Sequence, residues 1–179
     1  RDVYTYGRQN WFEHVRREHV AARERIAVFD QTSFAKFLLV GRDAEKALGW
    51  LCANDVAKPP GKLVYTQMCN ERGGIECDVT VSRLSEDTFY ILTGTAYGTH
   101  DADWIRRNLP AGADARLLDV TGMYTVLSVM GPSSRATLSS ICDADFSSEA
   151  FPFGTFQHVA IAGAPVRREI ARDLGLGVA

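Results

Sequence analysis

Apolar and polar residues recur with two different periods along the chain, and each period predicts a different kind of element. Between residues 12 and 26, apolar side chains return every three or four positions, which is helical spacing. Asn10, followed three residues later by Glu13, is typical of a capped helix start. We therefore predict a helix over residues 10–27.

The middle of the chain has short β-rich runs separated by turn residues, as in hairpins. Glu-Arg-Gly-Gly at 71–74 joins two such runs and offers glycines for positive φ. The predicted strands span residues 34–40, 63–70, 75–84, 88–93, 117–120, 124–130, 156–162 and 165–170. Further helices are predicted at 44–52 after an Asp43 cap, from residue 99 or 101 up to Pro110, and at 132–141. The expected fold is a single α+β domain with a mixed or antiparallel sheet and flanking helices.

Composition narrows the classes of partner. The 179 residues are 46% hydrophobic and 23% charged, with a formal net charge of −2, as in an ordinary globular domain. This charge balance argues against bulk electrostatic binding to nucleic acid or an anionic membrane, and no apolar run approaches the roughly 20 residues of a membrane span. The four cysteines form no Cys-x-x-Cys pair and the four histidines are scattered. We therefore expect no metal site and a reducing compartment.

Residues 75–82 carry the most informative candidate chemistry. With a strand period of two, Glu76 and Asp78 should share one face, about 7 Å apart, while Cys77 faces the other side. Aspartate is disfavoured inside strands, so Asp78 beside a second carboxylate suggests a function. The alternative is a solvent-facing hairpin with its polar residues turned outward, and the pattern alone leaves both interpretations open.

Three separated motifs around this hairpin resemble one family. They are Phe-Asp-Gln-Thr-Ser-Phe at 29–34, Cys-Ala-Asn-Asp-Val at 52–56, and the stretch 65–78 that contains Asn-Glu-Arg-Gly-Gly. The family is the folate-binding aminomethyltransferases, which include the T-protein of the glycine-cleavage system. The chain resembles the C-terminal tetrahydrofolate-binding region of dimethylglycine and sarcosine dehydrogenases more closely than it resembles the T-protein. Residues 6–12 resemble the passage from the FAD domain to the folate domain of those proteins, and Gly-Pro at 131–132 resembles a second family landmark.

The resemblance implies an N-terminal folate-binding subdomain and roles for several residues. Asp78 would lie near the pterin and act in catalysis, by stabilising an iminium cation or by taking a proton from a folate amine. Tyr65, Tyr97 and Glu76 would contact the same cofactor, tetrahydrofolate. From the residues alone, Tyr65 could instead be an ordinary aromatic residue of the sheet, and Tyr97 could simply pack against the protein. FAD would be confined to a separate domain of the parent protein, where an N-methyl amine is oxidised.

The same resemblance suggests that the chain is part of a longer protein. Residues 1–28 would be an opening segment and helix that follow an absent FAD domain. Residues 29–179 would be a partial folate-binding domain, truncated because residues 171–179 stand where the family has a Gly-Glu-x-Gly segment. The expected partners are folate, a small amine-derived one-carbon unit and the parent's FAD domain. The expected location is the bacterial cytoplasm, or the mitochondrial matrix of a eukaryote.

Two other functions remain open from the sequence. The chain could be a truncated, non-catalytic module of this fold that acts as a scaffold. It could also be a glycine-cleavage aminomethyltransferase with a lipoyl-carrier partner, although the opening at residues 6–12 argues against that.

Overall fold

The largest unit of the molecule is a five-stranded sheet with the strand order β3-β4-β5-β2-β6. The structure, a computed structural model, describes residues 1–170, with side chains described as far as Arg167. The strands of this sheet are β2 (Ala35–Val40), β3 (Leu63–Cys69), β4 (Ile75–Arg83), β5 (Thr88–Thr93) and β6 (Arg116–Asp119). Every neighbouring pair is antiparallel. The predicted α+β class is confirmed, and the segment 171–179 lies outside the described residues.

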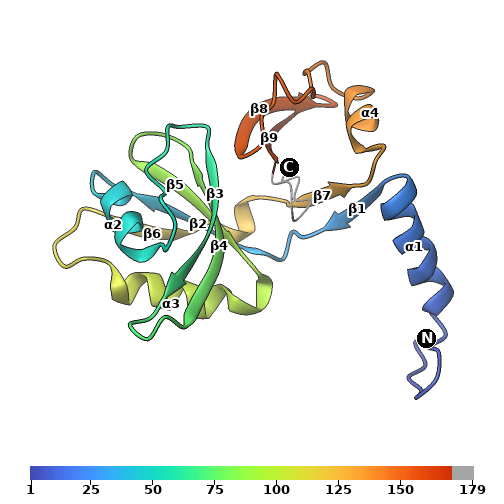
Figure 1. Cartoon of the computed structure of the whole chain (residues 1–179), viewed down its shortest axis with the longest axis horizontal. Helices are drawn as coiled ribbons and strands as arrows, with labels where there is room; N and C mark the ends of the chain where they lie inside the picture. The colour runs from blue at the N-terminus through green and yellow to red at the C-terminus, as the bar shows by residue number, and fades with distance from the viewer. Residues whose placement is uncertain (171–179) are drawn as a thin grey trace.

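Two helices, α2 and α3, cover one face of this sheet (Figure 1). The described helices are α1 (Phe12–Glu24), α2 (Ala44–Leu51), α3 (Gly98–Asn108) and α4 (Ser134–Ser139). The sheet contributes Phe37 and Ile91 to the main core, the helices contribute Leu48 and Ile105, and all four side chains are at most 1% exposed. Burial of each such side chain contributes about 1.5–3 kcal/mol. This packing holds the strands in place and leaves their alternate residues on the other face of the sheet.

A second group of elements lies beside the large sheet (Figure 1). It contains two small antiparallel sheets, one of β1 with β7 and one of β8 with β9. These strands are β1 (Ala27–Asp30), β7 (Leu127–Met130), β8 (Thr155–Ile161) and β9 (Ala164–Ile170). The β8–β9 hairpin matches the prediction. Strand β1 was not predicted, because helix α1 ends at Glu24 and the chain then extends to pair with β7.

Helix starts differ from the predictions for local reasons. Asn10 does not cap α1, because its Oδ1 accepts a hydrogen bond from the backbone nitrogen of Val3. Asp43 directly precedes α2 as predicted, but its carboxylate accepts the backbone N–H of Asp114 at 2.9 Å. Asn10 therefore binds the chain just before it, Asp43 binds a distant segment, and neither side chain caps the helix that follows it.

The Gly-Pro landmark lies against the end of α1. Gly131 has φ +117°, and a Cβ there would collide with the backbone carbonyl of Arg25. Glycine is therefore required both by its backbone conformation and by the close approach of α1. Helix α4 begins at Ser134 rather than at residue 132.

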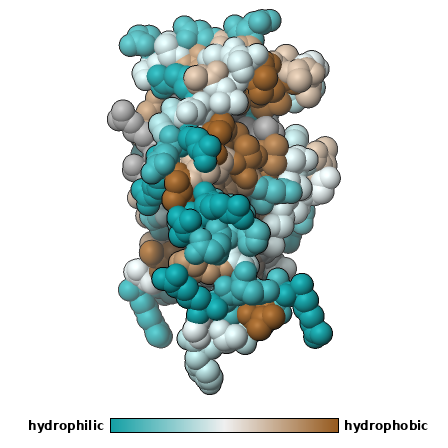
Figure 2. Space-filling view, turned by 90° about the vertical axis from the view of Figure 1, so that its right-hand side faces the viewer, coloured by the Kyte–Doolittle hydropathy of each residue, from teal (hydrophilic) through white to brown (hydrophobic). Residues whose placement is uncertain are grey.

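The end of the molecule that carries α1 exposes apolar surface. Helix α1 has no buried residue, and Val15, Val28 and Phe29 are among the exposed hydrophobic side chains. Figure 2, which looks onto this side, shows hydrophobic patches surrounded by hydrophilic surface. No helix within residues 1–170 has the length and apolar character that crossing a membrane requires.

Candidate functional site

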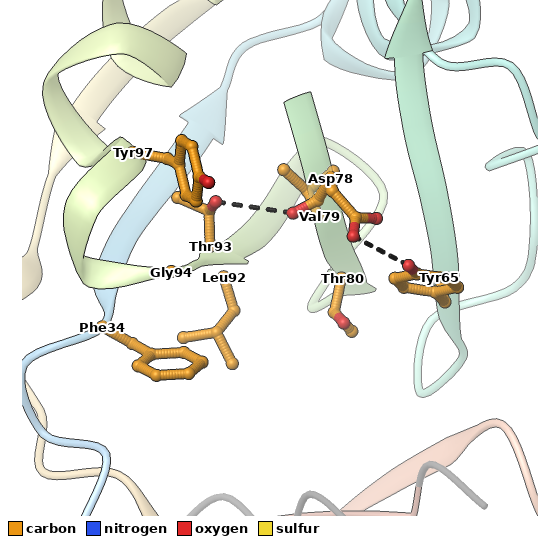
Figure 3. Close-up of a pocket in the computed structure, with 9 residues that line it drawn as sticks. All are labelled: Phe34, Tyr65, Asp78, Val79, Thr80, Leu92, Thr93, Gly94 and Tyr97. Carbon is orange, nitrogen blue, oxygen red and sulfur yellow. Dashed lines mark hydrogen bonds between the residues drawn. The ribbon is translucent and has the colours of Figure 1, made fainter. Parts of the chain in front are cut away.

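A cavity of about 210 Å³ opens on the sheet face that α2 and α3 do not cover (Figure 3). Its walls come from β3, β4, β5 and the turn that leads into α3. Phe34 and Leu92 supply apolar surface, Tyr65 and Tyr97 supply aromatic rings, and Asp78 supplies a carboxylate. The cavity therefore combines flat apolar surfaces with one acidic group, as a small-molecule site does.

Asp78 is held at the cavity by two neighbours on β3. The hydroxyl of Tyr65 donates a hydrogen bond to Oδ2 at 2.9 Å, and Nε2 of Gln67 donates one to Oδ1 at 3.0 Å. The strand register explains this arrangement, because Gln67 stands opposite Asp78 and Tyr65 stands opposite Thr80 on the same face. Each carboxylate oxygen has two lone pairs and so can accept a further bond. The carboxylate is thus fixed in orientation and still able to bind a donor or a cation.

The Tyr65 hydroxyl donates to Asp78, and this bond stabilises the protonated form of the hydroxyl. The pKa of Tyr65 is raised, mainly by its hydrogen bond to Asp78 and further by burial and by the negative charge of that carboxylate. Tyr65 as a whole residue is 47% exposed. A ligand in the cavity can therefore contact the ring while the hydroxyl remains bonded to Asp78.

The strand-to-helix turn builds the opposite wall. Tyr97 ends a 3-10 turn (Thr95–Tyr97), is 63% exposed, and lies across the cavity from Tyr65 (Figure 3). The hydroxyl of Thr93 donates to Oδ2 of Asp101 at 2.6 Å and lies 3.4 Å from the backbone carbonyl oxygen of Asp78. Thr93 therefore links β4, β5 and α3 at the point where Asp78 sits.

The prediction that Glu76 shares a face with Asp78 is wrong. The register of β3 and β4 shifts between Met68 and Cys69, which leaves Glu76 as the extra residue of a β-bulge. Its carboxylate lies 3.4 Å from Nε2 of His100 in α3. Glu76 is therefore turned toward α3 and is not among the residues that line the cavity.

The fold brings together three of the four predicted site residues, namely Tyr65, Asp78 and Tyr97. Sequence reasoning missed Gln67 and Thr93. For Gln67 a signal existed, because it lies two positions after Tyr65 and so falls on the same strand face. For Thr93 there was none, because its partners become neighbours only when α3 packs on the sheet.

Comparison with known proteins gives consistent matches. Residues 2–170 match the family model described as "GCVT N-terminal domain". The chain is 40% identical over 180 residues to "Sarcosine dehydrogenase, mitochondrial" of Homo sapiens, covering 93% of this chain and 20% of that protein. It is 33% identical over 163 residues to "Dimethylglycine dehydrogenase, mitochondrial" of Mus musculus, covering 90% of this chain and 19% of that protein. The chain thus spans about one fifth of the length of these relatives.

A solved structure supports the same fold. The glycine cleavage system aminomethyltransferase T from Bartonella henselae superposes with a TM-score of 0.70 at 21% identity, covering 87% of this chain and 43% of that one. At this identity the match establishes the fold. Together with the sequence matches, it confirms the resemblance read from the motifs around the β3–β4 hairpin.

Proposed function

The chain belongs to the GCVT N-terminal domain family, and from this membership we propose a specific role for the cavity beside Asp78. The chain is an aminomethyltransferase-like domain related to sarcosine and dimethylglycine dehydrogenases. Its proposed activity is the transfer of a one-carbon unit, obtained by oxidation of an N-methyl amine, to tetrahydrofolate. The observation that carries the proposal is the pair of hydrogen bonds by which Tyr65 and Gln67 hold Asp78 at the cavity wall.

The residues around the cavity fit part of a folate molecule. Phe34, Tyr65 and Tyr97 offer aromatic surfaces for a flat ring, and Asp78 offers an acceptor for its N–H groups. The volume of about 210 Å³ is below the roughly 300–1,000 Å³ of sites that enclose a drug-sized ligand. The described residues would therefore hold the ring portion of the cofactor. When bound, tetrahydrofolate supplies the amines to which the one-carbon unit becomes attached.

Asp78 is the proposed catalytic group. Its carboxylate would stabilise the positive charge of the iminium that delivers the one-carbon unit. It would also accept the proton that a folate amine loses on adding to the C=N bond, and would return a proton to the substrate nitrogen as the demethylated amine leaves. Tyr65 and Gln67 keep the carboxylate oriented, and Tyr97 would cover the ring. No folate contact is proposed for Glu76, which lies outside the cavity.

The oxidation that supplies the iminium is assigned to an FAD domain outside this chain. The relatives are about five times longer than the part that matches, and α1 buries none of its residues. The apolar surface that is exposed at the end of the molecule carrying α1 is typical of a surface that packs against another domain. The proposed location is the cytoplasm of a bacterium or the mitochondrial matrix of a eukaryote.

Asp78→Asn tests the assignment in the full protein that contains this chain. General acid–base catalysis contributes about 10²–10⁴-fold. We therefore expect formation of the methylene-folate product to fall by at least about 100-fold, while oxidation of sarcosine or dimethylglycine continues. Calorimetry with tetrahydrofolate separates loss of binding from loss of transfer.

The matched control is Asp103→Asn, which neutralises an exposed carboxylate of α3 paired with Arg107. It should leave oxidation and transfer unchanged. Product formation that is unchanged in folded Asp78→Asn protein would remove Asp78 from the mechanism. Absence of tetrahydrofolate binding by the unmodified protein would instead refute the proposed function as a whole.

A further inference from the structure

We propose that Cys77, His100 and Asp101 form a binding site for a divalent transition-metal ion of the zinc type. Within residues 1–170, one donor atom of each lies within 4.8 Å of the donor atoms of the other two. Thiolate, imidazole and carboxylate are the donors that zinc takes in proteins. Sequence spacing did not indicate this site, because Cys77 lies on β4 and the other two residues lie on α3. They meet where α3 packs on the sheet.

The ring of His100 is placed as in a metal-binding histidine. Its Nδ1 lies 3.0 Å from Oδ1 of Asp101, and its Nε2 lies 3.4 Å from Oε2 of Glu76. Two ligands of a tetrahedral zinc ion with bonds of about 2.0–2.1 Å are roughly 3.3 Å apart. Nδ1 and Oδ1 are therefore close to the spacing at which one ion bridges them. The other ring nitrogen would donate to Glu76, the kind of carboxylate partner that metal-bound histidines usually have.

Asp101 and Cys77 present buried donors to the same point. Asp101 is 1% exposed, and the Thr93 hydroxyl occupies its Oδ2 at 2.6 Å, which leaves Oδ1 for the ion. Cys77 is 2% exposed, whereas half of the His100 side chain is exposed. An ion can therefore enter past His100, and water can complete the four ligands that zinc prefers.

The charges of the cluster favour a dication. Burial raises the pKa of the Cys77 thiol, as do the nearby Asp101, Glu76 and Cys52, so the sulfur is protonated when no metal is bound. The pKa of His100 is raised by its hydrogen bond to Asp101, by that charge and by Glu76. A metal ion replaces the thiol proton and competes with the second imidazole proton. Binding should therefore release protons and weaken as the pH falls.

The metal site is independent of the folate proposal but adjoins the cavity. Cys77 directly precedes Asp78, and Thr93 contacts both Asp101 and the backbone carbonyl of Asp78. An ion at this point would tie β4 to the first turn of α3. Its expected role is structural, as a brace behind the cavity wall.

Metal titration of the reduced, chelator-treated chain tests the site. Zn²⁺ binding is measured by competition with a chromophoric chelator. Co²⁺ binding is followed by absorption, because a cobalt–thiolate bond produces a charge-transfer band that imidazole and carboxylate do not. We expect one equivalent of either ion to bind, with the thiolate band present and the affinity increasing with pH.

Variants identify the ligands. Glu76→Gln removes the negative charge of the outer partner and should lower the affinity by about 10–100-fold. Cys77→Ser and His100→Gln each remove a ligand and should lower it by more than about 100-fold, and Cys77→Ser should also abolish the cobalt–thiolate band. Cys69→Ser and His19→Ala change exposed donors outside the cluster and should change neither the affinity nor the band.

Circular dichroism establishes that each variant is folded. If Cys77→Ser does not fold, His100→Gln carries the test, because its side chain is half exposed. Failure of the unmodified chain to bind one equivalent would overturn the proposal. So would binding that survives His100→Gln, or a thiolate band that disappears in Cys69→Ser.

Discussion

Thr93 stands where the cavity, the sheet and helix α3 meet, so replacing it with valine tests the polar framework behind Asp78. Valine has nearly the same shape and removes one hydroxyl. That hydroxyl donates to Oδ2 of Asp101 at 2.6 Å. Thr93 is 3% exposed and Asp101 is 1% exposed, so water has little access to the oxygen that loses its donor.

The size of the effect follows from this burial. A hydrogen bond to a charged group contributes about 1.5–3 kcal/mol net, and an acceptor left buried without a donor costs a similar amount. We therefore expect Thr93→Val to lower the free energy of unfolding by about 1.5–3 kcal/mol. A domain of this size loses roughly 2–4 °C per kcal/mol, so the melting midpoint should fall by about 3–12 °C.

Urea unfolding followed by tryptophan fluorescence measures this change, because Trp104 of α3 packs against the main core. The matched control is Thr88→Val at the other end of β5, where the hydroxyl donates to exposed Asp87. The control should change the free energy of unfolding by less than about 0.5 kcal/mol. If Thr93→Val destabilises no more than the control, water or another donor reaches Asp101 and the reasoning is refuted.

Two titrations probe the same network. Tyr65 should ionise above its ordinary pKa of about 10, because ionisation breaks its bond to Asp78. Ring-carbon NMR measures this pKa, and Asp78→Asn should bring it back toward 10. An unchanged pKa in that variant would contradict the hydrogen bond. In metal-free protein, His100 should titrate above about 6.5, because two carboxylates favour its cation. Since the folded pKa is raised, this stabilisation is fully present below about pH 6.5 and is lost as the pH rises through the folded value. Proton NMR of the imidazole checks the shift, and a midpoint at or below 6.5 would count against the carboxylate contacts.

Most elements of the large sheet could be predicted from local pattern. The runs that became β3, β4 and β5 are short, β-rich and bounded by turn residues, and their alternate residues divide between a core face and an open face. The same alternation places Tyr65 and Gln67 together. Strand β1 escaped prediction because residues 27–30 form a strand only by pairing with β7, roughly a hundred residues later, and no local signal reports such a partner.

The prediction from strand alternation failed at Glu76. Glu76 has the strand position expected of a partner for Asp78, but the bulge after Met68 turns it toward His100. A bulge is set by how two strands close on each other and on the helix that covers them. The sequence alone shows the residues that flank a bulge, but it does not show the shift in strand register.

The order of residues along the chain was thus sufficient for the α+β class, the β3–β4 hairpin, the family resemblance and the choice of Asp78, because each depends on neighbours within a few positions. The cavity, the two bonds that orient Asp78 and the grouping of Cys77 with His100 and Asp101 required the folded molecule. These features join side chains from different elements at distances of a few ångströms. For the bonds to Asp78 these distances follow from the register of β3 and β4, and for the Cys77 group they follow from the packing of α3 on the sheet. Both depend on contacts between elements that a local pattern does not specify.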